Sequence, residues 1–199
     1  GVSSTATFKV TFDPSAAGTR TAMLYITNNV SSKSPYNFVL QGTGTYVEIA
    51  VTGNGSNITD GSVSPVTNNY TDFGNVGLMG STLSRTFTIS NSGNRVMGLG
   101  TVTTSGTHAT NFVITTQPTS PLNPSNTTTF VVQFDPSAVG LHTAALSFTN
   151  TDDSAGDGLT ENPFNFSIQG TGNAAGISNS PASISVSSTL GSAPASVGF

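Results

Sequence analysis

Four acidic residues lie within ten positions of one another in the second half of the chain: Asp152, Asp153, Asp157 and Glu161. The whole chain contains only nine Asp and Glu residues, so this segment holds a large share of them. Hard cations such as Ca²⁺ bind where several carboxylate and carbonyl oxygens converge, and a loop between strands can supply such oxygens. The spacing matches neither an EF-hand nor a nonapeptide calcium repeat. These four residues are therefore candidate Ca²⁺ ligands, and the alternative is a solvated acidic loop that aids solubility.

The same segment contains a candidate modification site at Ser154. The triplet Asp153-Ser154-Ala155 resembles the acceptor sequence of O-glycosylated surface proteins in some bacteria, where Asp and Ser or Thr precede a small residue. A glycan acceptor must be exposed, and a loop provides that exposure. The sequence therefore predicts Ser154 as the modified residue of this loop.

The acidic loop interrupts an internal repeat. Residues 6–29 read ATFKVTFDPSAAGTRTAMLYITNN and return 122 positions later, at 128–151, as TTFVVQFDPSAVGLHTAALSFTNT. Residues 34–45 return 128 positions later, at 162–173, so the second copy carries a six-residue insertion around the acidic residues. A repeat of such long period, with apolar alternation inside each copy, predicts tandem β domains rather than a short-period solenoid.

No pattern in the chain predicts catalysis. The two histidines, His108 and His142, accompany no Ser or Cys in a recognisable nucleophile motif, and His142 stands where the other copy of the repeat has Arg20. Asp13 and Asp135 each precede a proline, a pair that opens turns. We expect no enzymatic activity and no cofactor other than the candidate Ca²⁺.

Apolar and polar residues alternate over several short segments, as they do in half-buried strands. In 127–135, Phe130, Val132 and Phe134 fall on one face of such a strand. The same alternation marks 143–148 and 164–169, and further strands are expected at 46–52, 71–78, 83–90, 96–103 and 111–116. About seven to nine short strands separated by turns predict a two-sheet sandwich.

The amino-acid composition favours some classes of function and argues against others. Only 7% of the residues are charged, so solubility must come from Ser, Thr and Asn, as is typical of secreted and surface proteins. The chain has no cysteine, and each module must therefore be held by its apolar core alone. Five scattered Lys and Arg residues and a net charge of -4 leave no basic stripe for nucleic acid. No apolar run is long enough for a membrane-spanning helix, and no signal peptide is recognisable.

The repeat also sets the expected domain boundaries. Residues 46–172 make one complete module, 1–45 are the C-terminal part of a first module, and 173–199 are the start of a following β module. Each copy closes with Gln-Gly-Thr-Gly, which we expect to end a strand with two flexible residues. Because the chain begins with Gly1 and the outer modules are partial, we interpret it as a segment cut in mid-domain at both ends.

Three strings carry a family resemblance: TDFGNVGLMGSTLSRTFTISNSG at 71–93, TTFVVQFDPSAVGLHTAALSFTN at 128–150 and FNFSIQGTG at 164–172. Together they resemble the ASH or Hydin-like immunoglobulin-like family, and in particular the bacterial "choice-of-anchor D" modules of large secreted surface proteins. The resemblance implies an all-β fold of tandem immunoglobulin-like β-sandwich modules, one complete and two partial. Such modules act as repeated spacers or interaction modules, and the family has no catalytic residues to carry over.

Two functional hypotheses follow. The first is a structural stalk or fibre segment of a secreted, adhesin-like protein at the cell surface. Residues 1–45 would supply only about three strands, and their unpaired edges would seek neighbouring modules or copies of the chain. Head-to-tail strand complementation would fit, although the two partial modules together still lack the counterparts of 88–122. The second hypothesis is a module that binds a surface glycan or a host protein through the loops 53–69 and 151–162.

Overall fold

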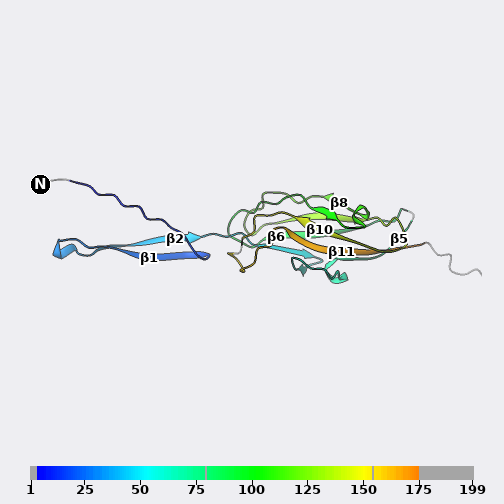
Figure 1. Cartoon of the computed structure of the whole chain (residues 1–199), viewed down its shortest axis with the longest axis horizontal. Coiled ribbons are helices and arrows are strands. Elements are labelled where there is room, and N and C mark those ends of the chain that lie inside the picture. Colours follow the sequence, from blue (N-terminus) through cyan, green and yellow to red (C-terminus); the bar gives the residue numbers. More distant parts are fainter. Residues whose placement is uncertain (1–3, 79, 154, 175–199) are drawn as a thin grey trace, which may run out of the picture.

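The structure, a computed structural model, describes residues 4–78, 80–153 and 155–174. The predicted acceptor Ser154 and nearly all of the predicted following module, residues 175–199, lie outside this range. The described part consists of strands, turns and three single-turn 3₁₀ helices, and Figure 1 shows the strands running along the long axis of the molecule. Among the described residues, no helix has the length and apolar character needed to cross a membrane.

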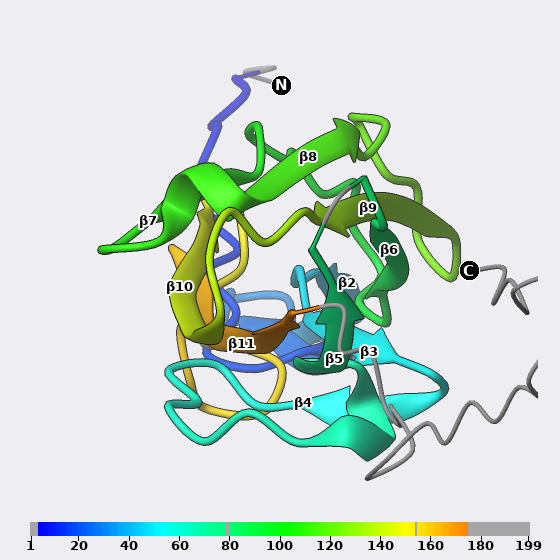
Figure 2. The ribbon, with the colours of Figure 1, turned by 90° about the vertical axis from the view of Figure 1, so that its right-hand side faces the viewer.

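The strands fall into three sheets. A separate two-stranded hairpin contains β1 (Gly18–Ile26) and β2 (Tyr36–Gly44), and the other nine strands of the described residues form a sandwich. One sheet of the sandwich has the order β5-β11-β10-β7, with bounds Asp72–Gly77, Phe164–Asn173, Gly140–Phe148 and Thr103–Ser105. The other has the order β4-β3-β6-β9-β8, with bounds Ser56–Ile58, Ile49–Gly53, Leu83–Asn91, Thr127–Phe134 and Phe112–Thr116. Figure 2 shows the two sheets end-on, and they confirm the predicted two-sheet sandwich.

The core of the sandwich is made by the alternating residues that the sequence indicated. On β9, Phe130, Val132 and Phe134 are fully buried. The inward residues of β10 and β11 are buried against them from the other sheet: Ala144, Leu146, Phe148, Phe164, Phe166 and Ile168. Aromatic rings fill the space between the sheets, with Phe87 stacked on Phe130 at a centroid distance of 5.2 Å. Burial of these large side chains is the main stabilising contribution to the module.

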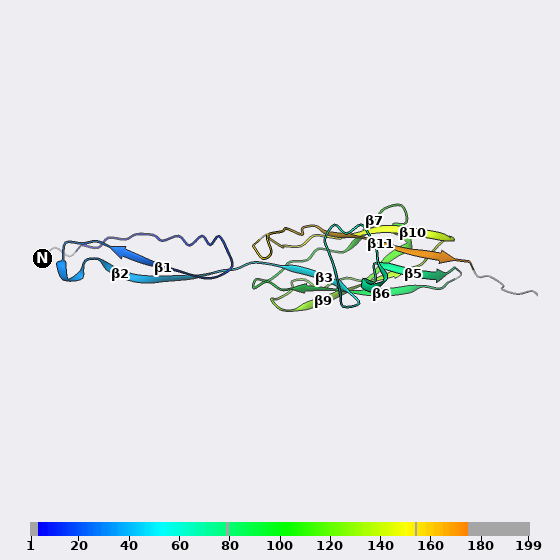
Figure 3. The ribbon, with the colours of Figure 1, turned by 90° about the horizontal axis from the view of Figure 1, so that it is seen from below.

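The N-terminal hairpin repeats the β10–β11 hairpin in register. Gly18 pairs with Gly44 at one end, as Gly140 pairs with Gly172 in the second copy. The segment 6–13 repeats the sequence of β9 and would be the third strand expected in residues 1–45, but the structure assigns no strand there. Figure 3 shows this segment extended alongside the hairpin.

The missing strand has a topological reason. In the complete module, β9 lies in the opposite sheet from β10 and β11 and is hydrogen-bonded only to β6 and β8. Counterparts of β6 and β8 are not among residues 4–44, so segment 6–13 has no sheet to join. The N-terminal unit therefore has two strands, not the three that we expected.

Two further differences concern the middle of the chain. β4 lies inside the segment 53–69 that the sequence presented as a loop, and it pairs with β3 through a short hairpin. The expected strand at 96–103 is reduced to isolated bridges, Met97 to Leu122 and Leu99 to Asn150, before β7 begins. Glycines at 98 and 100 let this segment cross closely over Thr149 and Thr151, where a side chain would collide.

Candidate functional site

The loop 151–162 connects β10 to β11, and the side chain of Asn150 fixes both of its ends. Asn150 Nδ2 donates to the Glu161 carbonyl at 2.6 Å, and Asn150 Oδ1 accepts from the Asp152 backbone N–H at 2.7 Å. The Asn150 backbone N–H donates to Asn162 Oδ1 at 3.1 Å. These bonds close the base of the loop before the insertion begins.

The first copy of the repeat closes its shorter loop in the same way. Asn28 Nδ2 donates to the Lys33 carbonyl at 2.7 Å, and Asn28 Oδ1 accepts from the Val30 backbone N–H at 2.8 Å. The Asn28 backbone N–H donates to Ser34 Oγ at 3.1 Å. We call this set of three asparagine hydrogen bonds the asparagine frame. It forms with or without the insertion, and Val30 and Lys33 occupy the positions that Asp152 and Glu161 have in the second copy.

The insertion brings two of its carboxylates to a third from the start of the sandwich. Glu48, Asp157 and Glu161 each offer a carboxylate oxygen, and these three oxygens lie within 4.8 Å of one another. The Asp157 backbone N–H also donates to Glu48 Oε2 at 3.1 Å. Any side chain at Gly156 would overlap the Glu48 carboxylate, so glycine permits this close approach.

Asp152 lies next to this group, in contact with Glu161, and is only 6% exposed. Its Oδ2 accepts from the Glu161 backbone N–H at 3.1 Å, whereas its Oδ1 is buried without a hydrogen-bond donor. Glu161 Oε2 is likewise buried without a donor, and the two carboxyl groups are in contact. We call Glu48, Asp152, Asp157 and Glu161 the acidic cluster.

The electrostatics of the acidic cluster follow from burial and from its like charges. The pKa of Glu161 is raised to about 7, first by loss of solvation on burial, then by the contact with Asp152 and by the charges of Asp152, Asp157 and Glu48. Burial also raises the pKa of Glu48, with the charges of Asp157 and Asp152 contributing next. The cluster therefore gathers four carboxyl groups with too few hydrogen-bond donors, and their mutual repulsion and burial oppose full ionisation.

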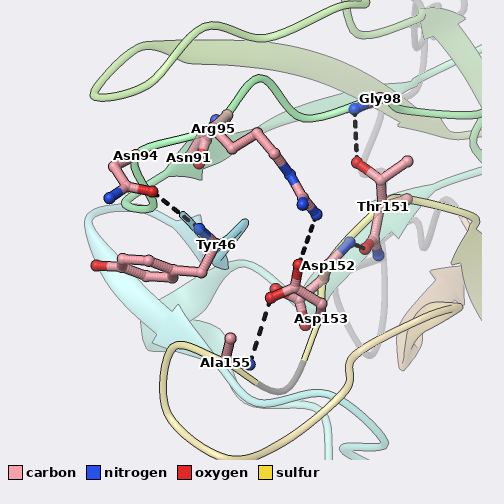
Figure 4. A network of polar contacts seen from close by, with 10 residues as sticks. Tyr46, Asn91, Asn94, Arg95, Gly98, Thr151, Asp152, Asp153 and Ala155 are labelled. Atoms are coloured by element: carbon pink, nitrogen blue, oxygen red, sulfur yellow. Dashed lines mark hydrogen bonds and ion pairs between the residues drawn. The ribbon is translucent and has the colours of Figure 1, made fainter. Parts of the chain in front are cut away.

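Asp153 lies outside the acidic cluster. Its Oδ2 forms an ion pair with Arg95 Nη2 at 2.6 Å, and its Oδ1 accepts from the Ala155 backbone N–H at 3.3 Å. Figure 4 shows Arg95 reaching across to this carboxylate. Of the four candidate ligands that the sequence indicated, the structure thus brings together three, Asp152, Asp157 and Glu161, and separates the fourth.

A cavity of about 280 Å³ opens beside the acidic cluster. Its walls come from β3, from the segment 57–60 and from the insertion, and its carboxylates are Glu48, Asp60, Asp157 and Glu161. The loops 53–69 and 151–162, which the sequence presented as separate recognition loops, therefore share one concave surface.

The histidines have structural partners. His142 is buried, with Nδ1 at 3.0 Å from Asn111 Oδ1 and Nε2 at 2.9 Å from the Ala138 carbonyl. His108 Nδ1 accepts from the Thr143 backbone N–H at 3.1 Å, and the two imidazole rings meet edge-on at 5.0 Å. These contacts join the turn before β10 to the segment before β8.

A second candidate surface lies on the N-terminal unit. A cavity of about 250 Å³ is lined by Val10, Thr11 and Phe12 of the extended segment and by residues 20–22 and 40–42 of β1 and β2. It lies between the extended segment and the hairpin, where the complete module has its core.

One family model matches the middle of the chain. Residues 65–160 match the family model of the HYDIN/CFA65/VesB-like immunoglobulin-like domain, which supports a Hydin-like immunoglobulin-like module in the middle of the chain. No curated protein matches the chain significantly.

Among solved structures, the chain is similar to the ASH/PapD-like domain 7 of human CEP192, with 13% identity, a TM-score of 0.39 and coverage of 66% of this chain and 89% of that one. A mutant Salmonella alpha-2-macroglobulin shows 13% identity, a TM-score of 0.35 and coverage of 78% and 8%. The Vibrio cholerae VesB protease shows 9% identity, a TM-score of 0.32 and coverage of 74% and 40%.

Proposed function

We propose that this chain, whose middle segment matches a Hydin-like immunoglobulin-like domain, is a structural stalk or fibre segment of a large secreted surface protein. The parent protein would be bacterial, adhesin-like and of the "choice-of-anchor D" type. Its partners would be neighbouring modules, supplied either by the same polypeptide or by another copy. The proposal involves no enzymatic activity, no nucleic acid and no insertion into a membrane.

The apolar face of the N-terminal unit is the observation that carries the proposal. Phe8, Val10 and Phe12 are 60%, 49% and 49% exposed, whereas their counterparts on β9 are 0% exposed. On the hairpin, Ile26 and Tyr36 are 37% and 58% exposed, whereas their counterparts Phe148 and Phe164 are buried in the core of the complete module. An apolar face of this extent on one unit is typical of an interaction surface.

The complete module indicates what would cover this face. There, β6 and β8 flank β9, and Phe87 of β6 and Phe112 of β8 stack on Phe130 and Phe134. Strands equivalent to β6 and β8 would therefore complete the N-terminal unit, either from a preceding part of the polypeptide or by strand addition from a second copy. Addition from a copy would be heterologous and would propagate into a fibre.

Light scattering over a range of concentrations tests the copy-to-copy form. We expect the chain to assemble as concentration rises, and the double variant F8S/F12S to remain monomeric. The variant V63S is the control, because Val63 is 80% exposed on the complete module and its loss should leave assembly unchanged. A wild-type chain that is monomeric at every concentration would exclude the copy-to-copy form.

The continuous form has its own test, because the repeat supplies the missing strands. Fusing a copy of residues 46–122 in front of Gly1 would reconstitute a complete first module. We expect the amide protons of segment 6–13 to become protected from hydrogen exchange in this fusion. If they exchange as fast as in the original chain, and that chain is also monomeric, the structural role proposed for this face is wrong.

A second candidate function is binding of a surface glycan or host protein through the loops 53–69 and 151–162. The observation that favours it is the cavity that the two loops share. The matched variant replaces residues 151–161 by residues 29–33, the shorter loop of the first copy. Selective binding on a glycan array that this replacement abolishes would support recognition, and an array without selective binding would exclude glycans as the ligand.

A further inference from the structure

We propose that the acidic cluster binds a divalent cation, Ca²⁺, which fastens the insertion to the first strand of the sandwich. The ligands are carboxylate oxygens of Glu48, Asp157 and Glu161. The buried carboxyl group of Asp152 contacts that of Glu161. This inference does not rest on the stalk or fibre role of the chain.

The distances fit one ion. Ca²⁺ takes oxygen ligands at about 2.3 to 2.6 Å, so two oxygens bound to the same ion lie at most about 5 Å apart. The oxygens of Glu48, Asp157 and Glu161 lie within 4.8 Å of one another. The neighbouring cavity leaves room for the water molecules that would complete the coordination shell.

Two buried oxygens of the cluster that lack a hydrogen-bond donor provide a second observation. Asp152 is almost completely buried, its Oδ1 has no donor, and its carboxyl group contacts that of Glu161, whose Oε2 also has none. A buried carboxylate without a compensating charge or donor is strongly destabilising. A proton shared by Asp152 and Glu161 would relieve only that pair, whereas a cation would also compensate Glu48 and Asp157.

No basic side chain among the described residues forms an ion pair with a carboxylate of the acidic cluster. Arg95 is the only basic residue paired with an acidic side chain among the described residues, and its partner is Asp153. The first copy of the repeat builds the same asparagine frame with Val30 and Lys33 in place of Asp152 and Glu161. The frame alone does not require carboxylates at these positions, which therefore need another explanation.

The position of the cluster suggests what the ion does. Glu48 lies two residues beyond Tyr46, where the chain passes from β2 into the sandwich. Asn94 already holds this passage, because its Oδ1 accepts from the Tyr46 backbone N–H at 2.8 Å and its Nδ2 donates to the Gly44 carbonyl at 3.4 Å. Figure 4 shows Tyr46, Asn94 and the start of the insertion together. A bound cation would tie the insertion to the same passage and stiffen the connection between units.

Tyr46 makes the site directly observable. A Cβ atom on Gly156 would stand 3.1 Å from Tyr46 Cδ2, so the ring lies beside the Glu48 carboxylate. Tb³⁺ binds in Ca²⁺ sites and luminesces when a nearby tyrosine is excited, and the chain contains four tyrosines and no tryptophan. When Tb³⁺ is added to the chelator-treated chain, excitation of tyrosine should therefore give Tb³⁺ luminescence. Added Ca²⁺ should reduce this luminescence by displacing Tb³⁺, and the substitution Y46F should abolish it.

Thermal melting of the full chain, after removal of metal with a chelator, provides the second measurement. We expect a dissociation constant of about 10⁻⁴ to 10⁻³ M, the range of extracellular Ca²⁺ modules. Ca²⁺ at about 1 mM should then raise the melting temperature by about 1 to 6 °C. Both E161Q, which preserves shape, and D152V, which takes the residue of the first copy, should weaken binding by about tenfold or more.

The control is D153N, because Asp153 is engaged by Arg95 outside the cluster. This variant removes the same charge from the same loop, and it should bind Ca²⁺ within about threefold of the wild type. The inference is overturned if the wild type shows neither luminescence nor a rise in melting temperature at millimolar ion. It is also overturned if E161Q binds as well as the wild type, or if D153N loses binding as completely as E161Q does.

Discussion

Gly170 lies so close to the ring of Phe134 that a Cβ atom on it would stand 2.5 Å from the ring carbon Cε1. The ring has little freedom to retreat, because it is stacked on Phe112 with a centroid distance of 4.7 Å. The first copy repeats the relationship, since a Cβ atom on Gly42 would stand 2.7 Å from the ring of Phe12. In both copies, glycine permits close approach between the hairpin and an aromatic residue that belongs to the facing layer.

The substitution G170A should therefore destabilise the sandwich. Forcing a methyl group against a ring that is fixed by its neighbours is expected to lower the free energy of unfolding by about 1 to 3 kcal/mol. Urea denaturation of the full chain measures the change. The control is G77A, because a Cβ atom on Gly77 would meet Ser81 at an ordinary 3.5 Å. Equal stabilities of G170A and G77A would contradict the packing explanation.

A second prediction concerns buried His142. The substitution H142A leaves Asn111 Oδ1 and the Ala138 carbonyl without their partner, and it opens a void beside Phe134, whose ring centroid lies 5.7 Å away. We expect a loss of about 2 to 4 kcal/mol in the free energy of unfolding. The side chain of the less buried His108 makes one hydrogen bond, to the Thr143 backbone N–H, so H108A should cost less than about 1 kcal/mol. A smaller loss for H142A than for H108A would show that these contacts are unimportant.

The ion pair between Arg95 and Asp153 should contribute little to stability. Its side chains are 50% and 35% exposed, and exposed pairs have coupling energies of about 0.2 to 1 kcal/mol. A double-mutant cycle with R95A and D153A measures this coupling, which should fall further as salt is added. A coupling well above this range would mean that the pair organises the whole insertion.

Most of the sandwich could be predicted from local patterns. Alternation placed β6, β9, β10 and β11 because each has one face in the core and one toward solvent. Alternation alone also predicts a strand at 6–13, whose residues repeat those of β9, and this prediction was wrong. A strand also needs a neighbouring strand, and the alternation does not show whether one is present. The Gln-Gly-Thr-Gly string does mark the strand ends, since β2 ends at Gly44 and β11 at Asn173, but its residues belong to the strands. Its first glycine serves close packing.

The acidic cluster shows the same limit. Asp152, Asp157 and Glu161 share one loop, so their number and spacing were visible in the sequence. Glu48 precedes them by more than a hundred residues and reaches them only because β3 begins beside the β10–β11 loop. No local signal marks it. Asp153 belongs to the same loop, but its side chain forms an ion pair with Arg95 instead of joining the cluster.

The acidic cluster also predicts how stability depends on pH in the absence of metal. The pKa of Glu161 is raised to about 7 in the folded chain, above its ordinary value of 4.5, and that of Glu48 is raised as well. Between these values the folded state binds more protons than the unfolded state, so the free energy of unfolding falls as pH rises. With a chelator present, the chain should therefore be less stable at about pH 8 than at about pH 5.

The variant E161Q separates this effect from other titrations. Because glutamine does not ionise, the decline in stability between about pH 5 and about pH 8 should become shallower in E161Q, as measured by urea denaturation at each pH. The control D153N removes a carboxylate for which Arg95 provides the opposite charge, and the decline should persist in that variant. An E161Q chain whose decline is as steep as that of the wild type would place the proton uptake elsewhere in the molecule.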